Sequence, residues 1–464
     1  MKKKIKRRMN YQKIFCFISF MFILVCILWY GGRFIYFYQD SKKTMTNESN
    51  TFARIVKTQN QDNENFKNVN QEYYFYGKNT NNYVSYSNLV WRIVKINEDN
   101  TILLITDNVI GSLAYGNLED KYEDSNIIHW LNHINDNDIS GVIEKYLNEK
   151  EKYLVKTSTC IDKIDDIEKV TCEKKNKDFY LGLLSIQDYI HTGGNNGFIA
   201  NERYSYMANK NKDNEIWYIN EDGKLDVSNG ETISGIKATI TLSPNLELKS
   251  GTGTQDDPYK FEDSTSILGS YIKLGEDTWR VYEEQDNIIK LISQDTILTD
   301  EKTLTNQKKT SSTSDINNDD KLEYSYASNS YYHNDTKKGS LAYYLNHTYY
   351  DSLSYKDLIL ENTYANGFYG SDSNYDYQNI MKNTIETKVA LPSISDILLN
   401  DTLSGYFTDT GTSETSSFVY IRKEKGAVSS KNVTSEAYVV PCISIQRDNL
   451  KAGSGNIEDP YRTE

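Results

Sequence analysis

Two hairpin patterns open two similar halves of this chain. Apolar and polar residues alternate over 89–96 and again over 101–105, on either side of a polar turn at 97–100. Such alternation around a turn predicts a β-hairpin with one buried face. The pattern returns around a turn at 283–287, so a second hairpin is expected there.

Helical spacing follows the first hairpin. Ser125 precedes one apolar stripe and is expected to cap its N-terminus; the stripe comprises Ile127, Trp130, Leu131 and Ile134. Ser185 and Ser393 each begin a Ser-Ile-x-Asp segment and are expected to open a second helix in their halves. Strands are predicted at 215–219 and 417–421, and a last apolar strand closes each half. This order predicts an α+β domain with an antiparallel sheet.

The two halves are diverged copies of one domain. Residues 248–260 match residues 450–462 at nearly every position, with an offset of 202 residues. Three more matched pairs occur in the same order: Val90–Val94 with Thr278–Tyr282, Leu131–His133 with Leu345–His347, and Leu184–Asp188 with Pro392–Asp396. An internal repeat in fixed order predicts one topology twice, over 73–262 and 263–464. The offset grows between the first two of these pairs, which places an inserted polar loop at 300–321.

The N-terminal region has the pattern of a membrane anchor. Residues 1–13 carry seven basic and no acidic side chains, and residues 14–30 are apolar except for Ser19. Basic residues stay on the cytoplasmic side, so a single helix over 14–38 would place the bulk of the chain outside the cell. A cleaved signal peptide is the alternative, but Trp29 and Tyr30 stand where small residues would be needed. The polar residues 39–72 are expected to form a flexible stalk.

Charge and composition narrow the classes of partner. The net charge is −13, and the acidic excess lies after the basic head, which argues against nucleic acid as a partner. Tyrosine is abundant, with 38 residues against 15 Phe. A tyrosine combines a large apolar ring with a polar tip, so it suits a core edge or a contact surface.

The ordered motifs resemble a family of extracytoplasmic bacterial domains. The motifs are Trp-Arg-Ile-Val, Leu-Leu-Ile-Thr, Trp-Leu-Asn, Gly-Leu-Leu-Ser-Ile-x-Asp and the Gly-x-Gly…Asp-Pro-Tyr turn. The resemblance implies a C-type-lectin-like fold related to carbohydrate- and protein-binding modules, in two tandem copies. It implies no established activity. This chain departs from the family at 216–218 and 239–242, and at the matching segments of the second copy.

Few residues suggest chemistry. Cys160 and Cys172 flank a polar loop and are expected to form a disulfide outside the cell, with two free thiols as the alternative. Cys442 has no partner in its own copy. His129 and His133 have a metal-ligand spacing, but they are expected to be surface histidines without a metal. No catalytic set is recognised, so the chain is not predicted to be an enzyme.

The repeated motifs are interpreted as scaffold. Each copy has a Trp-Arg pair, expected to be a core tryptophan beside a surface arginine: Trp91 and Arg92, Trp279 and Arg280. The Gly-x-Gly turn ends each copy with an Asp-Pro-Tyr segment that contains Pro258 and Tyr259, or Pro460 and Tyr461. A structural turn is expected, and a calcium loop stays open as the minority interpretation because carboxylates are close by. No other cofactor is expected.

The leading hypothesis is a membrane-anchored cell-surface protein that binds or adheres to glycans or to another protein. A structural component of the envelope or of a surface appendage is the first alternative, and an enzyme on a lectin-like scaffold is the second. Loops on a rigid scaffold usually carry recognition. The candidate binding surface is therefore a tyrosine-rich stretch in the second copy, with a loop that binds nothing as the alternative; it contains Tyr324, Tyr326, Tyr331 and Tyr332.

Overall fold

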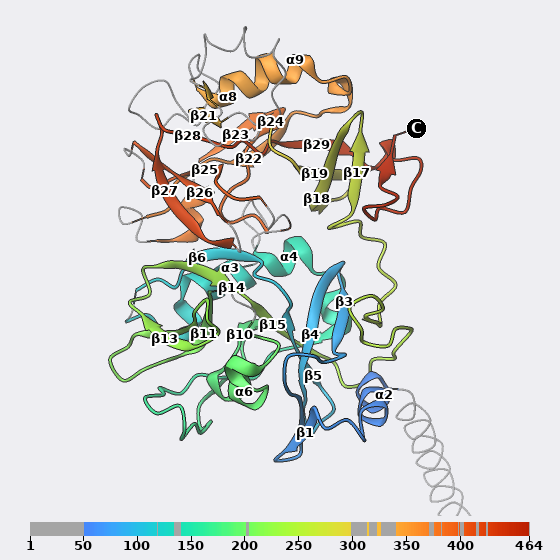
Figure 1. The fold of residues 1–464 in the computed structure, drawn as a ribbon, viewed down its shortest axis with the longest axis vertical. Coiled ribbons are helices and arrows are strands. Elements are labelled where there is room, and N and C mark those ends of the chain that lie inside the picture. The colour runs from blue at the N-terminus through green and yellow to red at the C-terminus, as the bar shows by residue number, and fades with distance from the viewer. Residues whose placement is uncertain are drawn as a thin grey trace, which may run out of the picture.

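The computed structural model contains two stacked units, which correspond to the two copies (Figure 1). It describes residues 51–117, 119–133, 141–200, 204–297, 313–314, 323–325, 340–370, 375–381, 383–397, 399, 403–413, 417–423 and 426–463. Antiparallel sheets dominate and helices are few, which confirms the α+β prediction. The expected anchor at 14–38 lies outside the described residues. Within those residues, no helix has the length and apolar character needed to cross a membrane.

The main sheet of the first copy has nine strands. Its central path runs β1-β2-β4-β5-β15-β10, with β3 and β16 added beside β4 and β7 added beside β15. The strands are β1 (Phe66–Val69), β2 (Glu72–Phe75), β3 (Tyr83–Tyr86), β4 (Leu89–Ile96), β5 (Ile102–Thr106), β7 (Leu154–Val155), β10 (Leu181–Leu183), β15 (Ala238–Leu242) and β16 (Tyr259–Lys260). The predicted hairpin is β4–β5.

The main sheet of the second copy repeats six of these strands in the same order. The path is β24-β29-β19-β18-β17-β30. The strands are β17 (Tyr271–Leu274), β18 (Asp277–Gln285), β19 (Ile288–Ser293), β24 (Val389–Ala390), β29 (Cys442–Gln446) and β30 (Tyr461–Arg462). They correspond in turn to β3, β4, β5, β10, β15 and β16.

Strand register supports the duplication residue by residue. Val84 lies opposite Trp91 in the first copy, and Ile272 lies opposite Trp279 in the second. Both hairpins carry a register shift at the same place, between Ile93 and Lys95 and between Val281 and Glu283. Because Trp91 and Trp279 occupy equivalent positions in equivalent strands, the predicted common topology is confirmed.

Each copy also has a three-stranded antiparallel sheet. One contains β11 (Ser205–Lys210), β12 (Ile216–Ile219) and β13 (Leu225–Ser228), and the other contains β25 (Tyr406–Gly411), β26 (Phe418–Arg422) and β27 (Val428–Asn432). The smaller pairings are β6 (Gly111–Ala114) with β14 (Ile233–Ile236), β8 (Thr159–Cys160) with β9 (Lys175–Asn176), and β22 (Asn362–Ala365) with β23 (Thr384–Thr387). β21 (Glu323–Ser325) lies between β20 (Thr313–Ser314) and β28 (Glu436–Ala437).

Short helices cover the sheets. The α-helices are α2 (Phe52–Gln59), α3 (Asn126–Asn132), α4 (Val142–Tyr146), α5 (Lys150–Tyr153), α6 (Ile186–His191), α8 (Leu341–Tyr344) and α9 (Tyr350–Ser352), and a π-turn, η3 (Leu345–Tyr349), joins the last two. The 3-10 turns are η1 (Tyr122–Asp124), η2 (Gly194–Asn196), η4 (Lys356–Leu358), η6 (Tyr377–Ile380) and η8 (Arg447–Asn449). Ser125 caps α3 and Ser185 caps α6, each accepting a backbone N–H through its side chain, as predicted.

One asparagine holds the first helix of each copy against its sheet. The Asn132 side chain donates to the carbonyl of Leu181 at 2.9 Å and accepts from the Leu181 N–H at 3.0 Å. Asn346 makes the same two bonds with Val389, at 2.7 and 2.9 Å. The repeated Leu-Asn-His motif therefore encodes a helix-to-strand clamp.

The predicted second helix of the second copy is wrong. Residues 393–396 form a turn, although Ser185 begins a helix at the equivalent place. The buried Arg422 guanidinium donates to the carbonyls of Ser393, Ile394 and Asp396 at 3.0, 2.9 and 2.7 Å. Those carbonyls point toward Arg422, so they are not available to a following helical turn.

The stalk prediction is also wrong for its second half. Residues 52–59 form α2, and residues 66–69 form β1. Phe52 and Val56 are fully buried, and the Phe52 ring packs 5.3 Å from the Tyr259 ring. The few apolar residues in this polar stretch recur at helical spacing, and their burial against the first copy orders the segment.

A continuous hydrophobic core joins the copies. The Asn126 side-chain Oδ1 accepts from the backbone N–H of Tyr377 at 2.7 Å, and the Trp130 indole donates to the backbone carbonyl of Ser395 at 3.1 Å. The fully buried Tyr369 hydroxyl accepts from the backbone N–H of Ala114 at 2.9 Å. The two copies are therefore packed against each other as one unit and are not independent domains joined only by a linker.

Candidate functional site

The Trp-Arg pair of the first copy is buried and has a structural role. Trp91 is fully buried, as predicted, and its indole donates to the carbonyl of Tyr86 at 3.1 Å. Arg92 was expected at the surface, but only 5% of it is exposed. Its guanidinium bonds Asn82 at 2.7 Å and pairs with Asp107 at 3.1 Å. These partners satisfy the charge that burial would otherwise leave uncompensated.

The second copy repeats this arrangement in part. Trp279 is fully buried, and Arg280 is partly buried with its Nε donating to the carbonyl of Gly269 at 2.9 Å. Each arginine stacks on the equivalent tyrosine: Arg92 lies 3.7 Å from the Tyr83 ring centroid, and Arg280 lies 5.1 Å from that of Tyr271. The arginine–tyrosine stack is thus part of the repeated scaffold.

The Gly-x-Gly motif forms the same turn in both copies. Gly251 and Gly453 have φ values of +96° and +97°, and a Cβ there would lie 2.1 and 2.2 Å from the carbonyl oxygens of Pro258 and Pro460. Only glycine tolerates that combination of positive φ and close backbone approach. The turn is followed by parallel pairing of Tyr259 with β3 and of Tyr461 with β17.

The acidic groups of these turns are engaged within the chain. Asp257 accepts from the Thr252 hydroxyl at 3.0 Å, and Asp459 pairs with Arg462 at 3.1 Å. These contacts give the motif a structural role in both copies.

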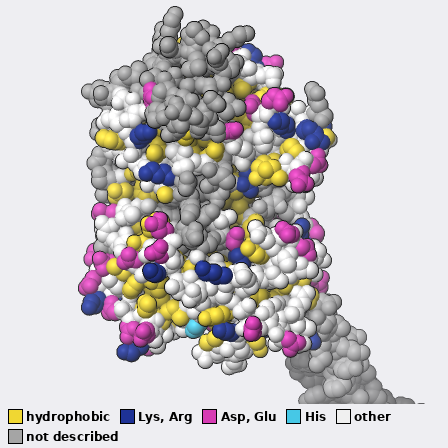
Figure 2. Space-filling model, viewed as in Figure 1, with side chains coloured by type: hydrophobic (Ala, Val, Ile, Leu, Met, Phe, Trp, Pro, Cys, Tyr) yellow, Lys and Arg dark blue, Asp and Glu magenta, His cyan; other side chains and the backbone are white. Residues whose placement is uncertain are grey.

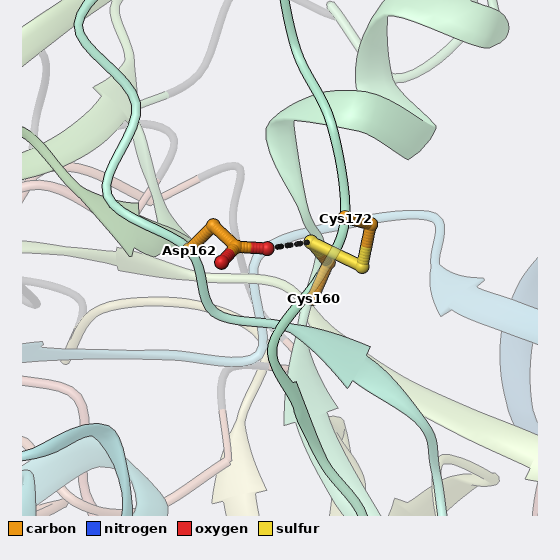
Figure 3. A group of neighbouring side chains, drawn as sticks. All are labelled: Cys160, Asp162 and Cys172. Atoms are coloured by element: carbon orange, nitrogen blue, oxygen red, sulfur yellow. Dashed lines mark hydrogen bonds between the residues drawn. A yellow bond between two sulfur atoms is a disulfide. The ribbon is translucent and has the colours of Figure 1, made fainter.

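Cys160 and Cys172 form a disulfide that closes the loop between them (Figure 3). Asp162 completes a group that has a metal-ligand composition, and its Oδ2 lies 3.4 Å from the Cys160 sulfur. An oxidised sulfur carries no proton, so this contact is not a hydrogen bond. The Asp162 carboxylate instead accepts the backbone N–H groups of Glu173 and Lys174, at 2.7 and 3.0 Å. Asp162 therefore holds the disulfide loop.

The two histidines of α3 do not converge with other ligands in the part of the chain that the structure describes. His129 is exposed, and the His133 ring lies 6.2 Å from that of Tyr377. Neither belongs to a group of potential metal ligands among the described residues. Cys442 is buried and unpaired by disulfide, and burial raises the pKa of its thiol well above the usual value.

The tyrosine-rich candidate surface stays a prediction. Tyr326, Tyr331 and Tyr332 lie outside the described residues. The backbone of Tyr324 belongs to β21, where it pairs with Ala437. Strand β20, at Thr313–Ser314, lies inside the segment that was expected to be an irregular loop.

A charged cluster inside the first copy was not predicted. Lys95 contacts Asp188 and Glu72, each at 3.0 Å, and the Tyr74 hydroxyl donates to both carboxylates. Burial alone would raise the pKa of Asp188, but the Lys95 charge and the hydrogen bonds lower it below its usual value. The cluster is self-contained: every member comes from the first copy.

The equivalent cluster of the second copy includes a lysine from the first. Glu283 stands at the position of Lys95, and Asp396 stands at that of Asp188, so two acids replace an ion pair. Lys145 of α4 lies 3.4 Å from Glu283, and Lys290 of β19 lies 2.9 Å from it. Burial alone would raise the pKa of Glu283, but the two lysines lower it to about 2.

Asp396 completes this cluster as its second acid. Its pKa is raised, first by burial and further by the Glu283 charge, while Lys145 opposes the rise. The side chain of Lys145 is 23% exposed and that of Glu283 is 10% exposed, so solvent screens their interaction weakly. The second copy therefore depends on a cation from the first copy to compensate its acids.

A cleft between the copies has a volume of about 810 Å³ and is lined by residues of both. Ligand pockets in proteins commonly fall between about 300 and 1,000 Å³. The first copy contributes β12, β13, β14 and their connections, and the second contributes the β26–β27 turn. The lining residues are Tyr204, Tyr206, Tyr218, Glu221, Val227, Ser228, Asn229, Thr232, Ile233, Ser234, Gly235, Ser404, Lys423, Ala427 and Val428.

Two tyrosine rings form a platform in this cleft. Tyr204 is 40% exposed, and its ring stacks on that of Tyr218 with a centroid separation of 6.1 Å and an interplanar angle of 27°. The Tyr218 hydroxyl donates to Asp226 at 3.3 Å, which restrains the ring. Tyr206 is buried beneath, and its hydroxyl donates to the carbonyl of Thr232 at 2.5 Å. The pair therefore consists of an exposed ring, Tyr204, stacked on a partly buried ring that a hydrogen bond holds, Tyr218.

The charged groups of the cleft are balanced. Glu221 and Lys423 are the charged side chains among its described lining residues, one of each sign. On the face that Figure 2 shows, acidic and basic side chains are interspersed over the described surface. No strong field of one sign selects a highly charged ligand here.

Sequence reasoning missed the cleft, because no pattern places the two copies relative to each other. A weak signal existed in Tyr204, Tyr206 and Tyr218, which occur close together in the least repeated part of the first copy. Comparison of the chain with protein-family models, with curated proteins and with solved structures gave no match.

Proposed function

We propose that this protein is a membrane-anchored cell-surface binding protein whose two lectin-like copies hold an extracytoplasmic ligand in the cleft between them. The observation that carries the proposal is the tyrosine platform of Tyr204 and Tyr218 in a cleft of about 810 Å³. Exposed aromatic rings in a concave site are the usual source of contact energy in recognition.

The proposed location outside the cell has two supports. The basic residues 1–13 followed by the apolar segment from residue 14 have the pattern of an uncleaved anchor with a cytoplasmic N-terminus. The Cys160–Cys172 disulfide is of a kind that persists in oxidising compartments and is rare in the cytosol.

The proposed lectin-like architecture is supported by the fold. Each copy contains a mainly antiparallel sheet, short helices, and a last strand that returns in parallel beside β3 or β17 of the same copy. The connections between strands are free to vary on such a scaffold, and the cleft is lined by strands together with their connections.

The test fills the cleft without touching the platform. Ala427 is exposed and lines the cleft, so Ala427→Trp should obstruct it. Ser430 lies three residues further along, in β27, is also exposed and does not line the cleft, so Ser430→Trp is the matched control. Cells displaying the full-length chain or either variant would be compared for attachment to immobilised envelope extract and to glycoprotein-coated surfaces.

We expect Ala427→Trp to abolish attachment and Ser430→Trp to retain it, with equal thermal midpoints for both variants. Equal attachment by the two variants would place the binding surface elsewhere. Failure of the unaltered chain to attach to any of these surfaces would refute the binding function.

A further inference from the structure

The cleft combines apolar faces with hydrogen-bonding groups in a way that favours one class of ligand. Its apolar contacts come from the exposed Tyr204 ring, the partly buried Tyr218 ring, Val227, Ile233 and Val428. Its polar side chains are Glu221, Ser228, Asn229, Thr232, Ser404 and Lys423. The described lining therefore includes both apolar and hydrogen-bonding side chains.

Sugars have the complementary chemistry. A pyranose ring has a C–H face that packs against an aromatic ring and a rim of hydroxyl groups that donate and accept hydrogen bonds. Carboxylate, amide and hydroxyl side chains provide both kinds of partner, and an aromatic platform provides the flat apolar contact. Resting on the proposed function, we infer that the ligand of the cleft is a neutral oligosaccharide that stacks on Tyr204 and Tyr218.

The platform geometry supports stacking by an extended chain of sugars. The two rings are 27° from parallel with centroids 6.1 Å apart, so they are offset and together form an extended aromatic surface. Tyr204 retains 40% exposure, while Tyr206 beneath it is buried. Because Tyr206 and Tyr218 are held by hydrogen bonds, the platform loses little freedom when a ligand binds.

Volume and charge define the class further. A cavity of about 810 Å³ exceeds what a single monosaccharide fills, so a longer chain is expected. Glu221 and Lys423 offset each other, so a polyanionic glycan gains no net attraction. A nucleic acid strand would need several cations along its phosphates, which the described lining does not provide.

Buried polar groups at the wall add hydrogen-bonding capacity. The Ser234 hydroxyl is buried and has no hydrogen-bond partner within the described residues. Asn229 is exposed just after β13; its Oδ1 accepts from the Glu231 N–H and the Thr232 hydroxyl, so its amide NH₂ is the group that can donate to a ligand. These groups lie on the first copy, opposite Lys423 and Ser404 of the second, so the ligand would contact both copies.

The experiment measures binding of the full-length chain, in detergent, to an array of neutral and acidic oligosaccharides of increasing length. Hits are then titrated with Tyr218→Ala, Tyr218→Phe and a control, Tyr343→Ala. Tyr343 is matched because it also stacks on another ring, that of His347 at 3.9 Å, and does not line the cleft.

We expect neutral oligosaccharides to bind and Tyr218→Ala to weaken binding by roughly tenfold. Tyr218→Phe keeps the ring and should stay within about twofold, and Tyr343→Ala should match the unaltered chain. Equal affinity for Tyr218→Ala and the unaltered chain would overturn the stacking inference, as would selective binding of acidic glycans.

The two proposals fail in different ways. If Ala427→Trp blocks cell attachment while no oligosaccharide binds the unaltered chain, the cleft is a binding site but its ligand is not a glycan. If oligosaccharides bind equally well to Ala427→Trp, the cleft itself is not the site and the proposed function falls with the inference.

Discussion

Lys145 offers a direct way to test how the two copies are held together. It lies in α4 of the first copy and contacts Glu283 of the second at 3.4 Å. Substitution Lys145→Met keeps a similar length and removes the charge. Glu283 and Asp396 would then be compensated mainly by Lys290, which lies 2.9 Å from Glu283.

The magnitude follows from the pKa of Glu283. The two lysines outweigh burial and lower this pKa from an ordinary 4.5 to about 2. A lowering of about 2.5 units corresponds to about 3 kcal/mol of stability at neutral pH. Lys145 exerts the larger favourable effect on this pKa, so Lys145→Met is expected to cost about 2 kcal/mol.

The pKa of Glu283 also predicts how the stability loss of Lys145→Met changes with pH. A carboxyl group whose pKa is lowered by folding contributes stability that is present above its unfolded pKa and is lost as the pH falls through the folded value. The deficit of Lys145→Met should therefore be full near pH 7 and much smaller near pH 2. Urea midpoints of the full-length chain at the two pH values measure it, with Lys152→Met as control because that side chain is 57% exposed.

A charge exchange sharpens the test. Glu283→Lys alone recreates the lysine of the first copy at Lys95 but repels Lys145, and Lys145→Glu added to it restores an opposite pair. Recovery of most of the lost stability by the double variant would support a direct interaction. An equal loss for Lys145→Met and Lys152→Met, or a Lys145→Met deficit unchanged near pH 2, would refute the reasoning.

Three further outcomes are expected. Removing the disulfide with Cys160→Ser should cost about 3 kcal/mol, and a reducing agent should lower the thermal midpoint of the unaltered chain but not of the variant. Gly251→Ala should lower the midpoint strongly, by about 2 kcal/mol or more, since its Cβ would meet a carbonyl oxygen, whereas Ala452→Gly on the equivalent turn should change little. Burial raises the pKa of Glu262 to about 7; the Glu149 charge adds to this rise, and the hydrogen bond from the Ser87 N–H opposes it. The folded protein therefore loses stability as the pH rises from about 4.5 through 7. Glu262→Gln should remove that loss, worth about 1 kcal/mol for this partly exposed group, and an unchanged pH profile would contradict it.

The repeated elements were predictable because their information is local. Alternating residues around a turn gave the β4–β5 hairpin, and serine caps gave the starts of α3 and α6. The Gly-x-Gly turn was predictable because positive φ restricts the residue type. In each case a few neighbouring residues determine the conformation.

The errors arose where a distant residue decides the outcome. Arg422 turns the carbonyls after Ser393 away from a helix, and Arg92 is drawn inside by Asn82 and Asp107. Residues 52–59 are ordered by packing against Tyr259, far along the chain. None of these partners can be assigned from the spacing of residues near each error.

The sequence does show that one charged position differs between the two copies. At the fixed offset of 188, Lys95 corresponds to Glu283, while the partner position keeps an aspartate in both copies, Asp188 and Asp396. A reversed charge beside an unchanged acid implies that other cations compensate the two acids. Lys290 of the same copy and Lys145 of the first copy both do so, and the sequence does not show that one of them comes from the other copy.

The Lys145–Glu283 ion pair and the cleft that contains Tyr218 both depend on how the two copies are packed. The cleft has walls from both copies, so its shape depends on how firmly the copies are held together. Lys145 does not line the cleft, yet loosening its contact should let the β26–β27 wall move relative to the platform. Lys145→Met is therefore expected to weaken ligand binding near neutral pH, by up to about thirtyfold if the whole loss of about 2 kcal/mol acts on the arrangement that binds the ligand. Titration of the same oligosaccharide with Lys145→Met and Lys152→Met measures this coupling. If Lys145→Met is measurably destabilised but binds with unchanged affinity, the hydrophobic core and the contacts of Tyr369 and Trp130 hold the cleft without the ion pair.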